Sequence, residues 1–181
     1  MSKSFPVISK STQAIPIHAI SEKQLAAWIK KQPVEHRRWL EANTFKAVPG
    51  ECCLIPGKNG EIAAVACGVE EKPGIWSLAS LPAKLPPHTY SLAGKFGKEQ
   101  ATQMALGWAL ACYQFNRYKK NGKPKPQLVA PATCDMNYVT SMYESICWAR
   151  DMINTPANDM NPAALAAEAA DWAKKSGAQV K

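Results

Sequence analysis

Short apolar runs separated by turn signals predict the strands of this chain. The run at 14–20 has strand character, and Pro16 within it predicts an edge strand, because proline cannot donate a hydrogen bond to a neighbouring strand. An Asn-Gly pair at 59–60 predicts a tight hairpin turn between an extended stretch over 45–56 and a returning strand over 62–69, which is apolar enough for burial on both faces. Shorter strands are expected near 75–78, 89–92 and 127–130.

Apolar residues spaced three and four positions apart predict the helices. The clearest stripe predicts a helix over 98–120, ended by Gly122 and Pro124. A second long helix is expected over 135–153. The remaining helices are indicated by their boundary residues: Ser21 as a cap with Gln24 as its capping-box partner, Pro33 as a first residue, and Asn161 as a cap with Pro162 following and Gly177 as the stop.

The alternation of strands with helices predicts an α/β domain in which helices cover a mixed sheet. The expected hairpin excludes a purely parallel sheet. At 181 residues, 46% of them hydrophobic, the chain is long enough for one domain, or for one domain with an additional piece. Residues 178–180 resemble the start of another strand just before the sequence stops, which predicts a fragment of a longer protein.

Charge adds one candidate surface. Lys and Arg number 22 against 14 Asp and Glu, and the net charge of +8 favours polyanions as chance partners. Because cations at the carboxyl end of a helix interact favourably with its dipole, a cluster that follows the 98–120 stripe is interpreted as a solvated helix end, with a phosphate or nucleic-acid patch as the alternative. Its members are Arg117, Lys119, Lys120, Lys123 and Lys125.

Other candidate chemistry is sparse. The six cysteines include no Cys-x-x-Cys pair, so they are interpreted as buried apolar side chains in a reducing cytosol rather than as a zinc site. His18, His36 and His88 lack metal-binding spacing, and no nucleophile elbow or phosphate-binding loop occurs. No signal peptide or membrane-spanning run is visible, which predicts a soluble cytoplasmic protein without a membrane partner.

Residues 149–165 carry the most specific motif, with Arg-Asp-Met-Ile-Asn-Thr-Pro-Ala-Asn-Asp-Met-Asn-Pro at its centre. This segment resembles the one that leads into the catalytic domain of the leucyl (cytosol) aminopeptidases. The helix before it also resembles a family helix, through Tyr113, Phe115 and the run 117–119, and the firm resemblance covers 105–165. The matching motif positions are Arg150, Asp151, Asn154, Thr155, Pro156, Ala157, Asn158, Met160 and Pro162.

Local chemistry gives the motif a structural interpretation in its own right. Pro156 restricts Thr155 to extended geometry, so the preceding helix is expected to end near Asn154. Asn158 and Asp159 can cap or turn the backbone locally. The segment is therefore interpreted as a rigid hinge between two helices.

The resemblance implies a fold and a domain order. It implies a macrodomain-like, three-layer α/β/α amino-terminal domain over 1–133, a linking helix over 134–153, and the start of a truncated catalytic peptidase domain over 154–181. The exposed faces of the last two helices are then expected to be apolar where the remainder of the catalytic domain would cover them.

The resemblance also implies an activity for the longer protein. Family members are metal-dependent exopeptidases that remove amino-terminal residues from peptides, hold two divalent ions, zinc or manganese, and assemble as hexamers. Their catalytic signature, Asn-Thr-Asp-Ala-Glu-Gly-Arg, does not occur here, so the fragment is predicted to be inactive, with no catalytic residue, metal ligand or cofactor, and with its own missing catalytic domain as a partner. The alternative is a binding module for nucleotide or ADP-ribose-like ligands or for nucleic acid.

Overall fold

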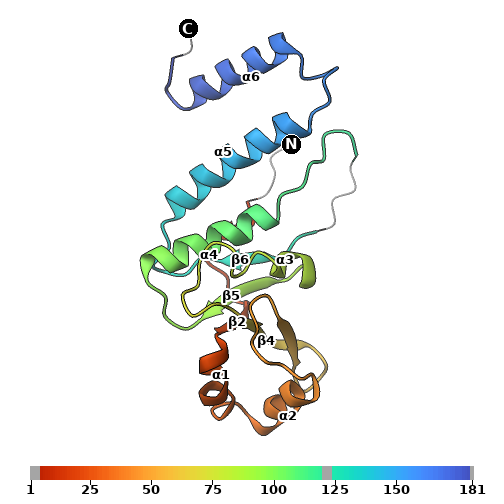
Figure 1. Ribbon diagram of the computed structural model, residues 1–181, viewed down its shortest axis with the longest axis vertical. Helices are drawn as coiled ribbons and strands as arrows, with labels where there is room; N and C mark the ends of the chain where they lie inside the picture. Colours follow the sequence, from red (N-terminus) through yellow and green to blue (C-terminus); the bar gives the residue numbers. More distant parts are fainter. Residues whose placement is uncertain (1–4, 120–123, 180–181) are drawn as a thin grey trace. The chain divides into compact units, whose positions relative to one another are not determined.

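The computed structural model describes residues 5–119 and 124–179. The chain divides into two compact units, Met1–Tyr143 and Glu144–Lys181. The first unit contains one sheet with its helices, and the second contains the end of a long helix and the last helix (Figure 1). The division falls inside the helix that was predicted as a linker over 134–153, and the predicted domain boundaries remain a prediction.

Within the described residues, the sheet has six strands in the order β1-β6-β5-β2-β4-β3. Only β3 is antiparallel to its neighbour, β4, and the other pairs are parallel. The mixed sheet and the hairpin are thus confirmed, and Gly60 in its turn has a φ of 84°, which glycine adopts at little cost. The strands are β1 (Val7–Ile8), β2 (Ile15–Ile20), β3 (Cys52–Pro56), β4 (Ile62–Gly68), β5 (Thr89–Ala93) and β6 (Gln127–Val129).

The helices start close to the predicted residues. The backbone N–H of Ser21 donates to Oε1 of Gln24 at 3.2 Å, which is the return half of the predicted capping box. Pro33 directly precedes the second helix instead of opening it. The helices are α1 (Glu22–Ile29), α2 (Val34–Ala42), α3 (Leu81–Lys84), α4 (Lys98–Ala111), α5 (Met136–Asn154) and α6 (Pro162–Lys175).

One face of the sheet packs against α4. Val7 pairs with Leu128, and Leu128 pairs with Tyr90, so these three buried side chains point to the same face. The ring of Tyr90 lies 6.0 Å from that of Trp108 in α4, and both residues are fully buried. This face is therefore the main core of the first unit.

The opposite face is only partly covered by helices. Its buried cluster joins Ile20 of β2 with Leu40 of α2 and Ile55 of β3, and the ring of Trp28 in α1 lies 5.2 Å from that of His18. Side chains on the same face toward β5, β6 and β1 are only half-buried: Ile8, Thr89, Ser91, Ala93, Gln127 and Val129. The α1–α2 layer thus shields the β2-β4-β3 half of the sheet better than the other half.

The structure corrects the prediction that Pro16 marks an edge strand. Strand β2 lies inside the sheet, between β5 and β4. Pairing with β4 begins only at Ile17, so Pro16 precedes that ladder and its missing N–H leaves no gap there. Proline is tolerated near the first residue of a strand, and the sequence pattern could not reveal that Pro16 has this position in an interior strand.

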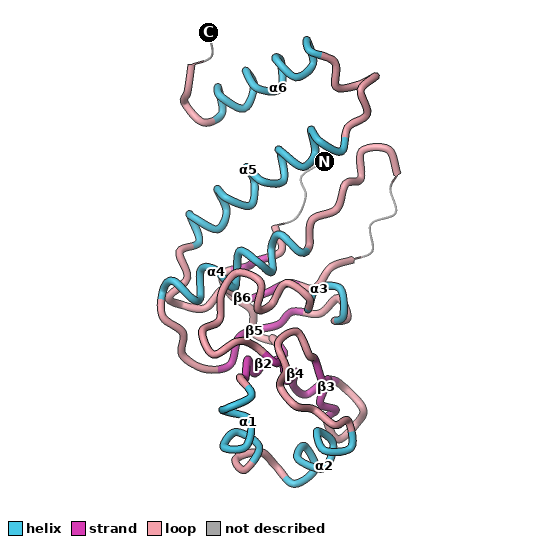
Figure 2. The backbone as a smooth tube through the Cα atoms, in the orientation of Figure 1, coloured by secondary structure: helices cyan, strands magenta, loops and turns pink. Residues whose placement is uncertain are grey.

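Three predicted elements have different limits. The helix predicted over 98–120 ends at Ala111, and the loop that follows is visible in Figure 2. Residues 75–78 form turns instead of a strand, and the extended stretch predicted over 45–56 becomes a strand only at 52–56. In contrast, β5, β6 and α5 lie where they were predicted, within two residues at each end.

Hydrogen bonds to Asp135 fix the start of α5. Its carboxylate accepts from the N–H of Tyr138 at 3.1 Å, and its own N–H donates to Thr102 Oγ1 of α4 at 2.9 Å. A hydrogen bond from Lys98, 2.9 Å away in the ion pair, is the main cause that lowers the pKa of Asp135. Within the described residues, no helix is long and apolar enough to cross a membrane.

Candidate functional site

The residues of the aminopeptidase-like motif lie where α5 ends and α6 begins, in the second unit. Arg150, Asp151 and Asn154 belong to the last turns of α5. The helix ends at Asn154, just before the Thr155-Pro156 pair, as the proline rule predicts. The remaining members, Ala157, Asn158, Met160 and Pro162, follow in the connection and in the first residue of α6.

Thr155 closes the end of α5 with two hydrogen bonds. Its hydroxyl donates to the carbonyl of Asp151 at 2.6 Å, and its N–H donates to the carbonyl of Met152 at 3.2 Å. The residue is 6% exposed, although its neighbours in the connection are mostly exposed. Thr155 therefore supplies hydrogen-bond donors to two carbonyls at the end of α5, and these bonds fix the start of the connection.

The connection is ordered from the α6 side as well. The N–H groups of Asp159 and Met160 both donate to the carbonyl of Pro156 at 2.9 Å, which forms a compact turn. The side chain of Asn161 then accepts from the N–H of Ala164 at 2.9 Å, so the predicted cap of α6 is confirmed. These bonds form a short, hydrogen-bonded joint between the two helices.

The joint is braced by an aromatic pair between the two helices. The rings of Trp148 in α5 and Trp172 in α6 lie 5.0 Å apart with an interplanar angle of 10°, a stacked arrangement. Ile153 and Leu165 remain 81% and 48% exposed. The second unit thus exposes two large apolar side chains, and their cover by the remainder of the catalytic domain stays a prediction.

The predicted basic cluster is not assembled at a helix end. Since α4 ends at Ala111, Arg117 and Lys119 follow it in a loop, and the dipole argument for the cluster was wrong. The guanidinium of Arg117 lies over the ring of Tyr118, 5.8 Å from its centroid, whereas Lys125 lines a hollow at the amino end of β6. Lys120 and Lys123 lie outside the described residues.

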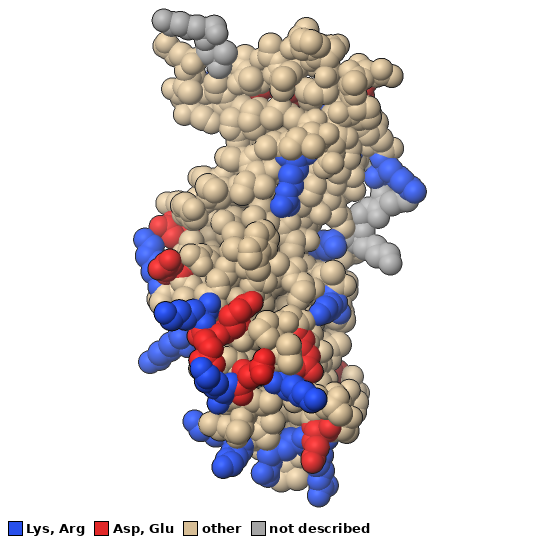
Figure 3. Space-filling view, in the orientation of Figure 1, with Lys and Arg blue, Asp and Glu red and all other residues tan. Residues whose placement is uncertain are grey.

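Charge is mixed on one face of the protein. On the face drawn in Figure 3, Lys and Arg are interspersed with Asp and Glu over the sheet-containing unit. Lys23, for example, pairs with Glu71 at 3.4 Å. A dedicated nucleic-acid surface usually concentrates one sign of charge, so this distribution does not favour the nucleic-acid alternative.

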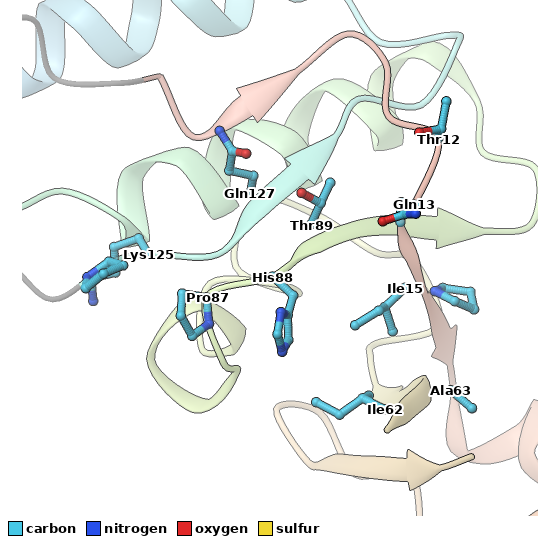
Figure 4. Close-up of a pocket in the computed structure, with 13 residues that line it drawn as sticks. Thr12, Gln13, Ile15, Ile62, Ala63, Pro87, His88, Thr89, Lys125 and Gln127 are labelled. Atoms are coloured by element: carbon cyan, nitrogen blue, oxygen red, sulfur yellow. The ribbon is translucent and has the colours of Figure 1, made fainter. Parts of the chain in front are cut away.

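A hollow of about 830 Å³ lies at the amino ends of β2, β4, β5 and β6 (Figure 4). Thr89 of β5 and Gln127 of β6 line it, as does His88, the residue directly before β5. Among the described residues that line it, Lys125 is the lysine, and none is a carboxylate. Sequence reasoning missed this hollow, because its residues come from separate segments that share no motif.

The position of the hollow argues against a catalytic role. Ligands of open α/β sheets usually bind outside the carboxyl ends of the strands, and this hollow lies at the opposite ends. The described residues that line it offer hydrogen-bonding groups but include no Ser, Cys, Asp or Glu. Across the described parts of the chain, no three His, Cys, Asp or Glu residues are grouped so that they could hold a metal ion.

The sequence and the fold were then compared with known proteins. A model of the M17 aminopeptidase N-terminal domain matches residues 15–131, well over half of the chain. The chain belongs to the M17 aminopeptidase family. The matched region holds β2 to β6, so these strands of the sheet lie in the part of the chain that matches the family's N-terminal domain.

Relatives of this M17 chain are cytosol aminopeptidases. A probable cytosol aminopeptidase of Geotalea uraniireducens (strain Rf4) is 28% identical over 158 residues, which covers 75% of this chain and 30% of the relative. The crystal structure of the cytosol aminopeptidase from Coxiella burnetii is 30% identical with a TM-score of 0.87, over 97% of this chain and 39% of that one. The M17 chain thus spans well under half the length of either protein.

A more distant structure supports the fold alone. The bottromycin maturation enzyme BotP in complex with Mn is 19% identical with a TM-score of 0.66, over 90% of this chain and 36% of that chain. Together the comparisons confirm the predicted leucyl aminopeptidase resemblance and the mixed, helix-flanked sheet. They do not favour the alternative of a nucleotide or nucleic-acid binding module.

Proposed function

We propose that this chain is the amino-terminal part of a metal-dependent aminopeptidase that removes amino-terminal residues from peptides. In this proposal residues 1–133 serve structure and assembly, residues 134–153 link the domains, and residues 154–181 begin the catalytic domain. The observation that carries the proposal is the likeness to the Coxiella burnetii cytosol aminopeptidase, which extends over 97% of this chain, beyond the 15–131 region of the family model.

The chemistry of the whole enzyme would come from two divalent metal ions, zinc or manganese. Such a pair activates a water molecule and polarises the scissile carbonyl, and it needs several carboxylate ligands close together. The described residues contain no such group of ligands, so no catalytic step is assigned to them. A manganese complex of the fold relative BotP supports manganese as one candidate.

The motif residues have a structural role in this proposal. The bonds of Thr155 and Asn161 and the turn at Pro156 would hold the start of the catalytic domain in a fixed relation to α5. Arg150, Asp151 and Asn154 would support the same joint from the last turns of α5. A cytoplasmic location and a hexameric assembly belong to the proposal through the family resemblance.

The proposal is tested by comparing two samples in hydrolysis of a leucine anilide with added Mn²⁺ or Zn²⁺. The 181-residue chain is expected to be inactive, and a longer product of the same gene is expected to be active only with metal. Metal-dependent turnover by the 181-residue chain would contradict the assignment. A longer product without paired carboxylate ligands after residue 181 would contradict it as well.

A further inference from the structure

Two cysteines face each other across the β3–β4 hairpin. Cys52 on the outer strand β3 is directly opposite Cys67 on β4 in the strand register. Directly opposite residues of an antiparallel pair point to the same face, so the two thiols lie on one side of the sheet. Cys52 is half-buried and Cys67 is fully buried, and both are free thiols.

The backbone hydrogen bonds identify the type of this pair. The N–H of Gly68 donates to the carbonyl of Glu51 at 2.9 Å, and the carbonyl of Gly68 accepts from the N–H of Gly50 at 3.0 Å. Glu51 and Gly68 are thus a hydrogen-bonded position of the ladder. Hydrogen-bonded and non-hydrogen-bonded pairs alternate, so the next pair, Cys52 with Cys67, is non-hydrogen-bonded. Cα atoms are about 4.5 Å apart in such pairs, within the span of roughly 4.4–6.8 Å that a disulfide bridges.

The surroundings of the thiols set their reactivity. Burial raises the pKa of Cys52 to about 11 and that of Cys67 to about 12. Lys84 of α3 lowers the pKa of both thiols, whereas Cys53 adds to the rise of the Cys52 pKa, and Cys52 and Glu70 add to that of Cys67. The pKa of the nearby Tyr90 is raised to about 12, mainly by burial and further by Cys52. Lys84 is held in place by a bond from Nζ to the carbonyl of Gly50 at 2.6 Å. The thiols are therefore slow to react at neutral pH and faster in alkali.

We propose that Cys52 and Cys67 are an oxidation site that forms an intrachain disulfide with low-molecular-weight disulfides such as oxidised glutathione. The Cys52 thiolate attacks one sulfur of the oxidant, and one glutathione thiolate leaves. The Cys67 thiolate then attacks the Cys52 sulfur and releases the second glutathione. Two protein thiols lose two protons and two electrons, and one glutathione disulfide is reduced to two glutathione molecules.

The bridge would tie the outer strand of the sheet to its neighbour. It would close the loop from Cys52 to Cys67, which contains the hairpin turn, and it would reduce the conformational freedom of the unfolded chain. Because the register already places the two residues opposite each other, little backbone movement is required. Oxidation is therefore expected to stabilise the fold instead of disrupting it.

The experiment treats the folded 181-residue chain with oxidised glutathione at mildly alkaline pH and maps disulfides by non-reducing peptide mass spectrometry. The expected product is a Cys52–Cys67 cross-linked peptide, with a rate that rises by up to about tenfold per pH unit below the thiol pKa. The thermal midpoint of the oxidised chain is expected to rise by roughly 5–10 °C and to return on reduction.

Matched variants separate this pair from the other thiols. Cys53 is adjacent in sequence but points to the opposite face, so Cys53→Ala is expected to keep the cross-link. Cys52→Ala is expected to lose both the cross-link and the thermal shift. A bridge to any other cysteine, a glutathione adduct that persists on Cys52, or a Cys52–Cys67 bridge that forms only in urea would overturn the proposal.

Discussion

At the scale of single residues, Thr44 at the end of α2 has a backbone conformation that is unfavourable for its side chain. The N–H of Thr44 donates to the carbonyl of Glu41 at 2.9 Å, and the N–H of Phe45 donates to that of Leu40 at 3.0 Å. This pair of bonds is the Schellman motif, in which glycine usually occupies the left-handed position. Here that position holds Thr44 with a φ of 51°, which is unfavourable for a β-branched residue.

Replacing this residue is expected to stabilise the protein. Thr44→Gly should raise the free energy of unfolding by about 1 kcal/mol, because glycine removes the left-handed strain while its extra freedom in the unfolded chain offsets part of the gain. Chemical denaturation measures the effect. The control is Asn43→Gly at the preceding residue, whose φ of −87° gives glycine no advantage, and this variant should lose stability. Equal effects of the two variants would contradict the explanation.

Gly107 in α4 is required because another part of the backbone lies too close for a side chain. A Cβ atom at Gly107 in α4 would lie 1.6 Å from the carbonyl oxygen of Ile75, which is a backbone atom. Although alanine is the better helix former, Gly107→Ala should lower the free energy of unfolding by about 2–3 kcal/mol or prevent folding. Gly97→Ala at the N-cap of α4 is the control. Apart from its chain neighbours, no described atom lies within 4 Å of its added Cβ, so only the preference of the cap for glycine is lost and the free energy of unfolding should fall by at most about 1 kcal/mol.

At the scale of elements, the joint between α5 and α6 depends on its caps. Asn161→Ala removes the acceptor for the N–H of Ala164 and is expected to destabilise the start of α6 by about 1 kcal/mol. Hydrogen exchange of the first α6 amides reports this locally. Asn158→Ala, at an exposed position of the same connection, should leave that exchange nearly unchanged. Faster exchange in both variants would mean that the cap is not the cause.

Element types were predictable from the sequence because local chemistry determines them. The Asn59-Gly60 turn, the Asn161 cap and the end of α5 before Pro156 were all identified correctly. Each of these depends on neighbours within about four residues, through backbone sterics or side-chain hydrogen bonds.

Element limits that depend on the rest of the fold were predicted less well. The apolar stripe of α4 continues past Ala111, but residues 113–119 are half-buried or exposed, so burial adds little to the stability of a longer helix. The aromatic residues there, Phe115 and Tyr118, pack on each other at 5.8 Å instead. The internal place of β2 and the hollow with His88 depend on strand order, which periodicity does not contain.

At the scale of the whole molecule, His18 links stability to pH. Burial is the main cause that lowers its pKa below 6.5, with a further contribution from His36. A base with a lowered pKa in the folded state binds fewer protons there than in the unfolded chain, so stability falls as the pH decreases below about 6.5. The ring of Trp28, 5.2 Å away, is part of the packing that causes the shift.

This linkage can be measured by urea unfolding at several pH values. Between about pH 8 and pH 5 the unfolding midpoint of the natural chain should decrease, and His18→Gln should flatten the decrease. A variant with the same pH dependence as the natural chain would show that other groups are responsible.

The outer border of the sheet at β3 also determines how copies of the protein behave at high concentration. Residues Leu54 and Pro56 alternate with those bonded to β4, so their backbones face outward. The carbonyl of Leu54 already accepts from Trp39 Nε1 at 2.8 Å, and Pro56 has no N–H to offer. An incoming strand therefore lacks two of the backbone groups that a continuous ladder would use here, which weakens pairing and polymerisation through this border.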